Sequence, residues 1–155
     1  MTKLTATTHC PECGGHFSAG ETCTDRYHAC MALELTDSAY GVVHHLTVPA
    51  YILQHSSHLS ADGWQAMCQI LHDFLVAGVS PARMRQLIQK QQKIRPKSFS
   101  MVKGAVAAQP TWTWTKTILT VRLDDPTRYC ADVRAWAEAV HRDIQQADIT
   151  GFVRE

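Results

Sequence analysis

A histidine-rich stretch at residues 38–58 constrains the fold of this chain more than any other part of the sequence. It reads S-A-Y-G-V-V-H-H-L-T-V-P-A-Y-I-L-Q-H-S-S-H and contains His44, His45, His55 and His58. On the 3.6-residue period of an α-helix, His44, Tyr51 and His55 share one narrow stripe with apolar Val48. A stripe of imidazole, phenol and apolar carbon favours a binding site over a core face. The alternative is that these histidines are hydrogen-bonded into the core.

The geometry of this helix limits which histidines can share one metal ion. His44 and His55 are eleven residues apart, which is about 16 Å along a straight helix. One ion can therefore bind only one of them unless the helix is broken. Pro49 is a candidate break, either as a kink inside the helix or in the first turn of a new helix capped by Thr47. The sequence leaves both alternatives open.

A short cysteine motif near the N-terminus, C-P-E-C-G-G, has the form of a zinc knuckle. It places Cys10 and Cys13 three residues apart, and the glycine after Cys13 allows backbone N–H groups to turn towards the sulfurs. The rival interpretation is a redox C-x-x-C, which lies between a strand and a helix. No strand is expected before Cys10, so we favour metal binding.

Two thiolates do not complete a zinc site, and the sequence offers candidates for the remaining ligands. Ser18 and Glu21 have the spacing of a capping box that would begin a helix running to about residue 35. Cys23 would lie in its first turn, where the helix dipole favours a thiolate. The predicted zinc ligands are Cys10, Cys13, Cys23 and His44, with His45 as the substitute for His44. Three thiolates and one imidazole form a closed structural zinc site.

The length and composition limit the classes of protein to which this chain can belong. The chain has 155 residues, 45% of them hydrophobic, which is enough for one compact domain with its own core. Its first nine residues lack the apolar region of a signal peptide, and no apolar run is long enough to cross a membrane. We therefore expect a cytoplasmic protein with no membrane partner, in which the six cysteines are thiols or metal ligands.

The pattern of apolar residues and caps predicts a mainly α fold, a small bundle of about five helices. Ser60 and Ser80-Pro81 are typical helix starts, and Asp125-Pro126 begins the last helix. Residues 112–123 alternate like a strand. The expected single domain, 1–155, divides into a zinc knuckle (1–20), a helical core (21–93), a loop with an extended segment (94–125) and a C-terminal helix (126–150).

A basic region lies in the second half of the chain. No acidic residue occurs from Phe74 to Leu123, whereas nine of the fifteen lysines and arginines fall there. Such a run is most often a solvated face, and residues 83–103 are the candidate patch for RNA or DNA. The net charge of +1 argues against a protein built mainly for nucleic acid.

The same motifs carry a resemblance to a known family. The segments that match are Cys10-Pro11-Glu12-Cys13-Gly14, Cys23, residues 39–48 (A-Y-G-V-V-H-H-L-T-V), Tyr51, Leu53-Gln54-His55 and the later V-R-A-W-A-E at residues 133–138. On these residues the chain resembles an uncharacterised bacterial family, domain of unknown function 5946, over most of its length. The resemblance implies no activity.

Two classes of function follow from these observations. The first is a zinc protein in which the metal holds together a small binding or adaptor domain for a small molecule or another protein. The alternative is a metal-dependent enzyme with a pocket on the central helix, where His55 would act as general acid or base and Tyr51 would donate a hydrogen bond. His58, one turn on, would join them. Nucleic-acid binding through residues 83–103 is the weaker third hypothesis, and the sequence leaves the oligomeric state open.

Overall fold

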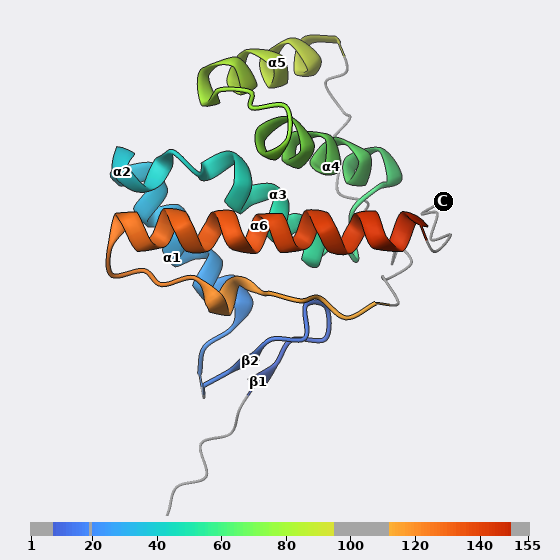
Figure 1. Cartoon of the computed structure of the whole chain (residues 1–155). Helices are drawn as coiled ribbons and strands as arrows, with labels where there is room; N and C mark the ends of the chain where they lie inside the picture. Colours follow the sequence, from blue (N-terminus) through green and yellow to red (C-terminus); the bar gives the residue numbers. More distant parts are fainter. Residues whose placement is uncertain (1–7, 19, 95–111, 150–155) are drawn as a thin grey trace, which may run out of the picture.

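The computed structural model describes residues 8–18, 20–94 and 112–149 (Figure 1). Its elements in chain order are β1 (Thr8–His9), β2 (His16–Phe17), α1 (Cys23–Thr36), α2 (Ser38–Gly41), α3 (His44–Gln54), α4 (Ala61–Leu75), α5 (Pro81–Ile94), the 3₁₀ turn η1 (Ile118–Thr120) and α6 (Pro126–Ile149). The prediction of a mainly α fold with a small N-terminal knuckle is confirmed.

Polar caps set the helix starts. Ser60 accepts a hydrogen bond from the Gly63 N–H at the start of α4, as predicted. The predicted capping box at Ser18 is wrong. The box of α1 is formed four residues later, where Thr22 accepts from the Asp25 N–H and the Asp25 carboxylate accepts from the Thr22 N–H. The shift places Cys23 at the first residue of the helix.

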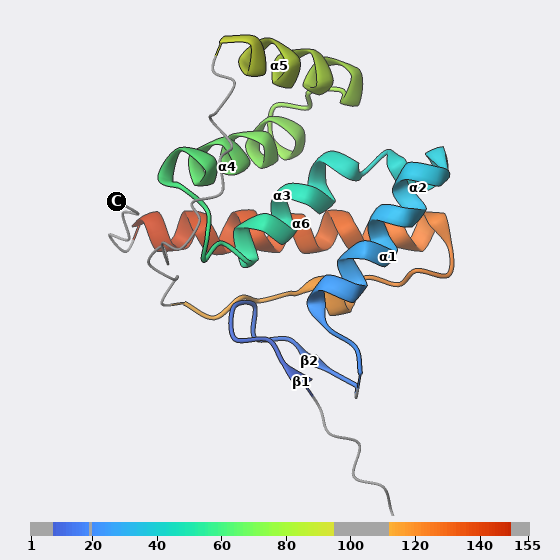
Figure 2. The same cartoon turned by 180° about the vertical axis from the view of Figure 1, so that it is seen from behind.

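The central histidine-rich stretch forms two helices rather than one. A turn at Val42 and Val43 separates α2 from α3, and α3 then continues through Pro49 without a new helix start. The hypothesis that Thr47 caps a second helix is therefore wrong. Viewed from behind, α1 leads away from the β-hairpin and α3 leads back towards it (Figure 2). The two ends of α3 consequently have different neighbours.

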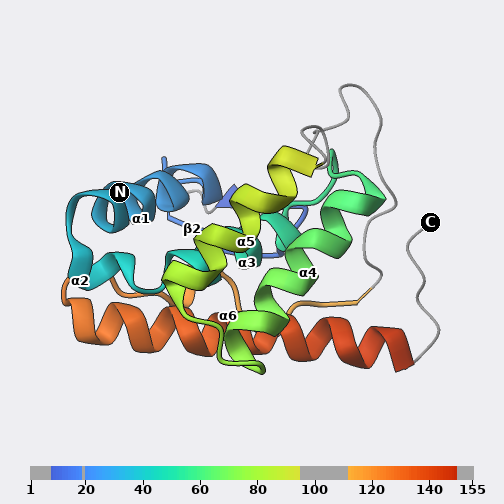
Figure 3. The ribbon, with the colours of Figure 1, turned by 90° about the horizontal axis from the view of Figure 1, so that it is seen from above.

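The core lies where α3 packs against α4 and α6. Seen from above, the long helix α6 runs along the whole molecule, and α4 and α5 lie on the same side of it as α3 (Figure 3). Among the buried side chains that form this core are Leu46, Leu53, Leu71, Tyr129, Val133 and Trp136. No helix in the described ranges is both long enough and apolar enough to span a membrane.

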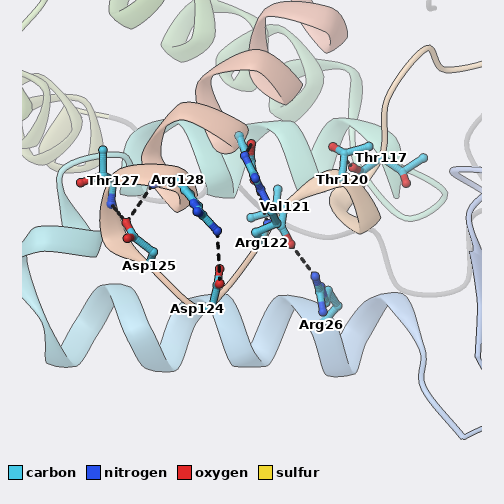
Figure 4. A network of polar contacts seen from close by, with 10 residues as sticks. Arg26, Thr117, Thr120, Val121, Arg122, Asp124, Asp125, Thr127 and Arg128 are labelled. Carbon is cyan, nitrogen blue, oxygen red and sulfur yellow. Dashed lines mark hydrogen bonds and ion pairs between the residues drawn. The ribbon is translucent and has the colours of Figure 1, made fainter.

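The segment that precedes α6 was predicted to be strand-like, and this prediction is wrong. Trp114, Ile118 and Val121 are its buried residues, at spacings of four and three rather than two. Side chains of other elements, not a neighbouring strand, bind its backbone. Examples are Asp143, whose carboxylate accepts from the Thr115 N–H at 2.8 Å, and Arg26, which donates to the Val121 carbonyl (Figure 4). Residues 112–123 therefore form an irregular segment across the helices, which we call the strap.

Gln54 joins this strap to two helices. It lies in the last turn of α3 and is 1% exposed. Its Nε2 donates to the Lys116 carbonyl at 2.6 Å, and its Oε1 accepts from the Trp136 indole N–H of α6 at 3.0 Å. A buried amide with both ends bonded fixes the relative positions of all three segments.

Candidate metal centre

The cysteine motif forms the turn of a two-stranded antiparallel hairpin. Strand β1 pairs with β2, and Cys10 and Cys13 lie in the turn between them. Gly14 has a φ of +79°, which glycine adopts without strain, and the next N–H, of Gly15, donates to the Cys13 sulfur at 3.4 Å. We expected no strand before Cys10, and this expectation is wrong, because the two-residue strand β1 (Thr8–His9) precedes it. The chain nevertheless returns as a strand and not as the helix of a redox motif.

Four potential metal ligands meet beside this turn. The ligand atoms of Cys10, Cys13, Cys23 and His55 all lie within 4.8 Å of one another. Cys23 is the first residue of α1, and His55 is the residue at which α3 ends. Cys13 and Cys23 are buried, and Cys10 and His55 are partly buried. The cluster therefore joins the hairpin to the ends of two helices.

The two ring nitrogens of His55 have different surroundings. Nδ1 lies 2.8 Å from the Tyr51 carbonyl oxygen, to which it donates. Nε2 is buried and has no hydrogen-bond partner. A backbone carbonyl on one nitrogen is the arrangement that fixes the tautomer of a metal-binding histidine and leaves the other nitrogen as the ligand atom. The unpaired Nε2 is the buried polar atom that a metal ion would satisfy.

One of the three sulfurs, that of Cys13, favours the thiolate form. The Cys13 and Cys23 sulfurs lie 3.4 Å apart. The pKa of Cys13 is lowered to about 4, mainly by the hydrogen bond from Cys23 and further by His55 and the Gly15 N–H, against the opposing effect of burial. The pKa of Cys23 is raised, because its proton is held by Cys13 and because it is buried. A site that already favours an anionic sulfur suits a soft cation.

The predicted fourth ligand, His44, is not in this cluster, and the structure puts His55 in its place. His44 is the first residue of α3, so it lies at the far end of that helix from the hairpin. Its Nδ1 is 2.8 Å from a carboxylate oxygen of Glu34, near the end of α1. The substitute, His45, follows it at the same end. His44 and His55 lie at opposite ends of α3, about 16 Å apart along the helix, so one ion cannot bind both of them.

Tyr51 and His55 were the candidate catalytic residues. The Tyr51 ring stacks between the rings of Tyr27, at 4.0 Å, and His55, at 4.2 Å, and its hydroxyl lies 3.4 Å from the Thr24 hydroxyl. These contacts form a packed aromatic layer beside the cysteines. His58 is exposed in the turn after α3. The aromatic layer supports the ring of His55, and this gives Tyr51 a positioning role.

A polar contact also ties the hairpin to the chain after α3. The Ser57 N–H donates to the Glu12 carboxylate at 3.0 Å. Glu12 lies between the two cysteines of the knuckle, so this bond sets the hairpin turn beside His55. The sequence analysis gave Glu12 no role, and it named His55 as a candidate acid or base rather than as a neighbour of the cysteines.

Comparison with known proteins gives one match. A model of a family described as a family of unknown function, DUF5946, matches residues 8–145. The chain belongs to this family. Searches of curated proteins and of solved structures found no match. The resemblance drawn from the sequence motifs is therefore confirmed at the level of the family.

The DUF5946 match begins at β1 and ends within α6, so it includes all four residues of the cluster. It also includes the candidate nucleic-acid patch at residues 83–103, of which the structure describes only the part in α5. Arg83, Arg85, Lys90 and Lys93 are exposed on that helix, and residues 95–103 lie outside the described ranges. Nucleic-acid binding by this DUF5946 protein stays the weaker of the hypotheses.

Proposed function

We propose that the chain binds one zinc ion through Cys10, Cys13, Cys23 and His55, and that this zinc is structural. The observation that carries the proposal is the buried, unpaired Nε2 of His55 beside three cysteine sulfurs. Three thiolates and one imidazole are a common ligand set of tetrahedral structural zinc sites. In such a site the Zn–S distance of about 2.3 Å sets neighbouring sulfurs roughly 3.8 Å apart, close to the 3.4 Å between Cys13 and Cys23.

The type of ligand supports zinc over other common ions. Magnesium and calcium prefer oxygen ligands, whereas thiolate and imidazole together suit zinc. The four protein ligands fill a tetrahedral ion and leave no open position for a water or a substrate. His55 uses one nitrogen for a backbone carbonyl and the other for the ion, so it is not left to act as an acid or base. These points favour a structural metal over the enzyme hypothesis at Tyr51 and His55.

The hairpin is too short to be stable without an additional interaction such as a bound metal ion. Two strands of two residues each are marginal in water without other support. Phe17, the buried apolar residue of β2, contributes packing, but the turn that holds Cys10 and Cys13 bears only small and polar residues. Zinc would connect this turn to α1 and α3, and so order the N-terminal part of a small helical binding module.

We expect protein purified without added metal to contain one zinc ion per chain, measured by elemental analysis. After denaturation with a chelator, all six cysteines should react as free thiols. Cys23→Ser should reduce the zinc content to below about one tenth, because a structural site with a missing thiolate binds far more weakly. The matched control is Cys130→Ser, since Cys130 lies in α6 and its side chain donates to the Ala39 carbonyl, which serine can also do.

The competing chemistry is a disulfide between Cys13 and Cys23. It predicts four reactive thiols instead of six and no bound metal. A folded, metal-free protein with four thiols would therefore overturn the zinc proposal.

A further inference from the structure

A cleft lies at the end of α3 opposite to the cysteine cluster. Two cavities adjoin there and share His44, His45 and Ile88 in their walls. The narrower cavity, about 190 Å³, is otherwise lined by apolar side chains: Val48, Pro49, Met67 and Ile70. The wider cavity, about 440 Å³, adds polar and charged side chains: Glu34, Arg85 and Gln89. The cleft is therefore apolar at one end and polar at the other.

A buried carboxylate organises the polar end. The Glu34 side chain is fully buried, and three groups donate to its oxygens: His44 Nδ1 at 2.8 Å, the Tyr129 hydroxyl at 2.6 Å and the Thr47 hydroxyl. Burial and the neighbouring carboxylate raise the pKa of Tyr129, which keeps it a donor. Burying a carboxylate is costly unless hydrogen-bond donors surround it, and here three donors bind the two oxygens of Glu34. Glu34 thereby fixes the His44 ring with Nε2 as its remaining polar atom.

The groups around this end favour an anion. Arg85 and His45 line the wider cavity beside His44. Burial first, and then the neighbouring His44 and Arg85, lower the pKa of His45, so Arg85 is the permanent cation among the residues that line the two cavities. The first two residues of α3, His44 and His45, line both cavities, and the N-cap, Val43, offers no side-chain hydrogen bond. Free N–H groups and the helix dipole at such an end attract negative charge.

The negative charge of Glu34 does not cancel this preference. It is the one acidic residue among those that line the two cavities, and its oxygens are occupied by the three donors. A ligand in the cleft would therefore meet His44 Nε2, the Arg85 guanidinium and the helix N-terminus. The Arg85 guanidinium and the backbone N–H groups donate hydrogen bonds to an acid group, and His44 Nε2 donates one in the imidazolium form, in which Nδ1 stays bonded to Glu34.

We propose that this cleft binds a small organic acid, with its apolar body in the narrow cavity and its acid group between Arg85 and His44. The narrow cavity is the right size, because a cavity of about 150 Å³ holds a benzene molecule. The shared chemistry is an anionic group on a flat apolar body, and both a carboxylate and a phosphate ester satisfy it. The proposal does not depend on the zinc site.

Three probes of similar size test it on the full chain as purified. Phenylacetate and phenyl phosphate are the two acids, and phenylacetamide is the neutral counterpart of phenylacetate. NMR titration should give dissociation constants in the millimolar range for the acids, as expected for so few atoms, and binding at least about fivefold weaker for the amide. The acid that binds more tightly identifies the preferred group. The imidazole signals of His44 and His45 should shift, and those of His9 and His16, in the hairpin at the other end of α3, should not.

Two arginine variants on the same helix provide the decisive comparison. Arg85→Gln should weaken binding of the acid roughly tenfold, because a charged hydrogen bond is lost, and should leave the amide unchanged. Arg83→Gln removes the same charge from an exposed position outside the cleft and should have no effect. Equal binding of acid and amide, equal effects of the two variants, or shifts confined to other histidines would each overturn the proposal.

Discussion

Replacing His55 with alanine is expected to release the metal and to destabilise the protein by more than about 3 kcal/mol, since loss of a metal belongs to the few changes with effects this large. For a chain of this size the loss corresponds to a decrease of roughly 10 °C in the melting temperature. The reason is geometric: His55 brings the only non-sulfur ligand atom to the four-residue cluster. Zinc content and thermal unfolding, measured on the same sample, check this expectation.

The matched control is His44→Ala at the other end of α3. This variant removes one donor to the buried Glu34 carboxylate and should cost about 1–3 kcal/mol, but it should keep its zinc. A protein with the opposite behaviour, in which the His44 variant loses zinc and the His55 variant retains it, would show that the cluster is not the metal site.

Gln54→Leu is expected to destabilise the protein by about 2–4 kcal/mol without changing the zinc content. Leucine has a similar size but leaves the Trp136 indole N–H and the Lys116 carbonyl without their partner, and each unpaired buried group costs about 1–3 kcal/mol. Trp136 is fully buried, so water cannot replace the lost acceptor there. Chemical denaturation at a fixed zinc concentration measures the free energy of unfolding.

The same substitution at an exposed glutamine provides the control. Gln69 is exposed on α4, and its side chain donates to the partly exposed carboxylate of Asp73. Gln69→Leu should change the free energy of unfolding by less than about 0.5 kcal/mol. Equal effects at positions 54 and 69 would mean that the buried amide does not hold the strap and the helices together.

Much of the helical fold could be predicted because local signals specify it. Ser60 before α4, Ser80-Pro81 before α5 and Asp125-Pro126 before α6 are caps that act within one turn of the chain. The proximity of Cys10, Cys13 and Cys23 could be predicted for the same reason, since all three lie within or beside one local motif. Features that depend on contacts between distant segments were predicted less well.

The fourth residue of the cluster is the clearest example. Sequence spacing shows that His44 and His55 occupy opposite ends of a helix, but not which end meets the hairpin. The chain reverses its direction at α2. Residues that lie equally far from α2 along the sequence, one before it and one after it, therefore face each other. Three contact pairs lie at equal distances on either side of Ala39: Glu34 and His44 at five residues, Tyr27 and Tyr51 at twelve, and Cys23 and His55 at sixteen. Applying this symmetry would have selected His55.

The strap shows a second limit. Residues 112–123 have the alternating composition of a strand. Their backbone groups nevertheless bind side chains from four different helices, namely those of Asp143, Gln54, Arg26 and Tyr40. Such bonds connect residues more than sixty positions apart in most cases, and a local pattern contains no information about them.

The most direct test of the metal centre is X-ray absorption spectroscopy at the zinc edge of the full chain as purified. The account predicts three sulfur neighbours at about 2.3 Å and one nitrogen neighbour, with the signature of an imidazole ring, at about 2.0–2.1 Å. The imidazole signal should disappear in any residual zinc site of His55→Ala and persist in His44→Ala. A spectrum with only nitrogen and oxygen neighbours, or with four sulfurs and no imidazole, would contradict the assignment of Cys10, Cys13, Cys23 and His55 as the zinc ligands.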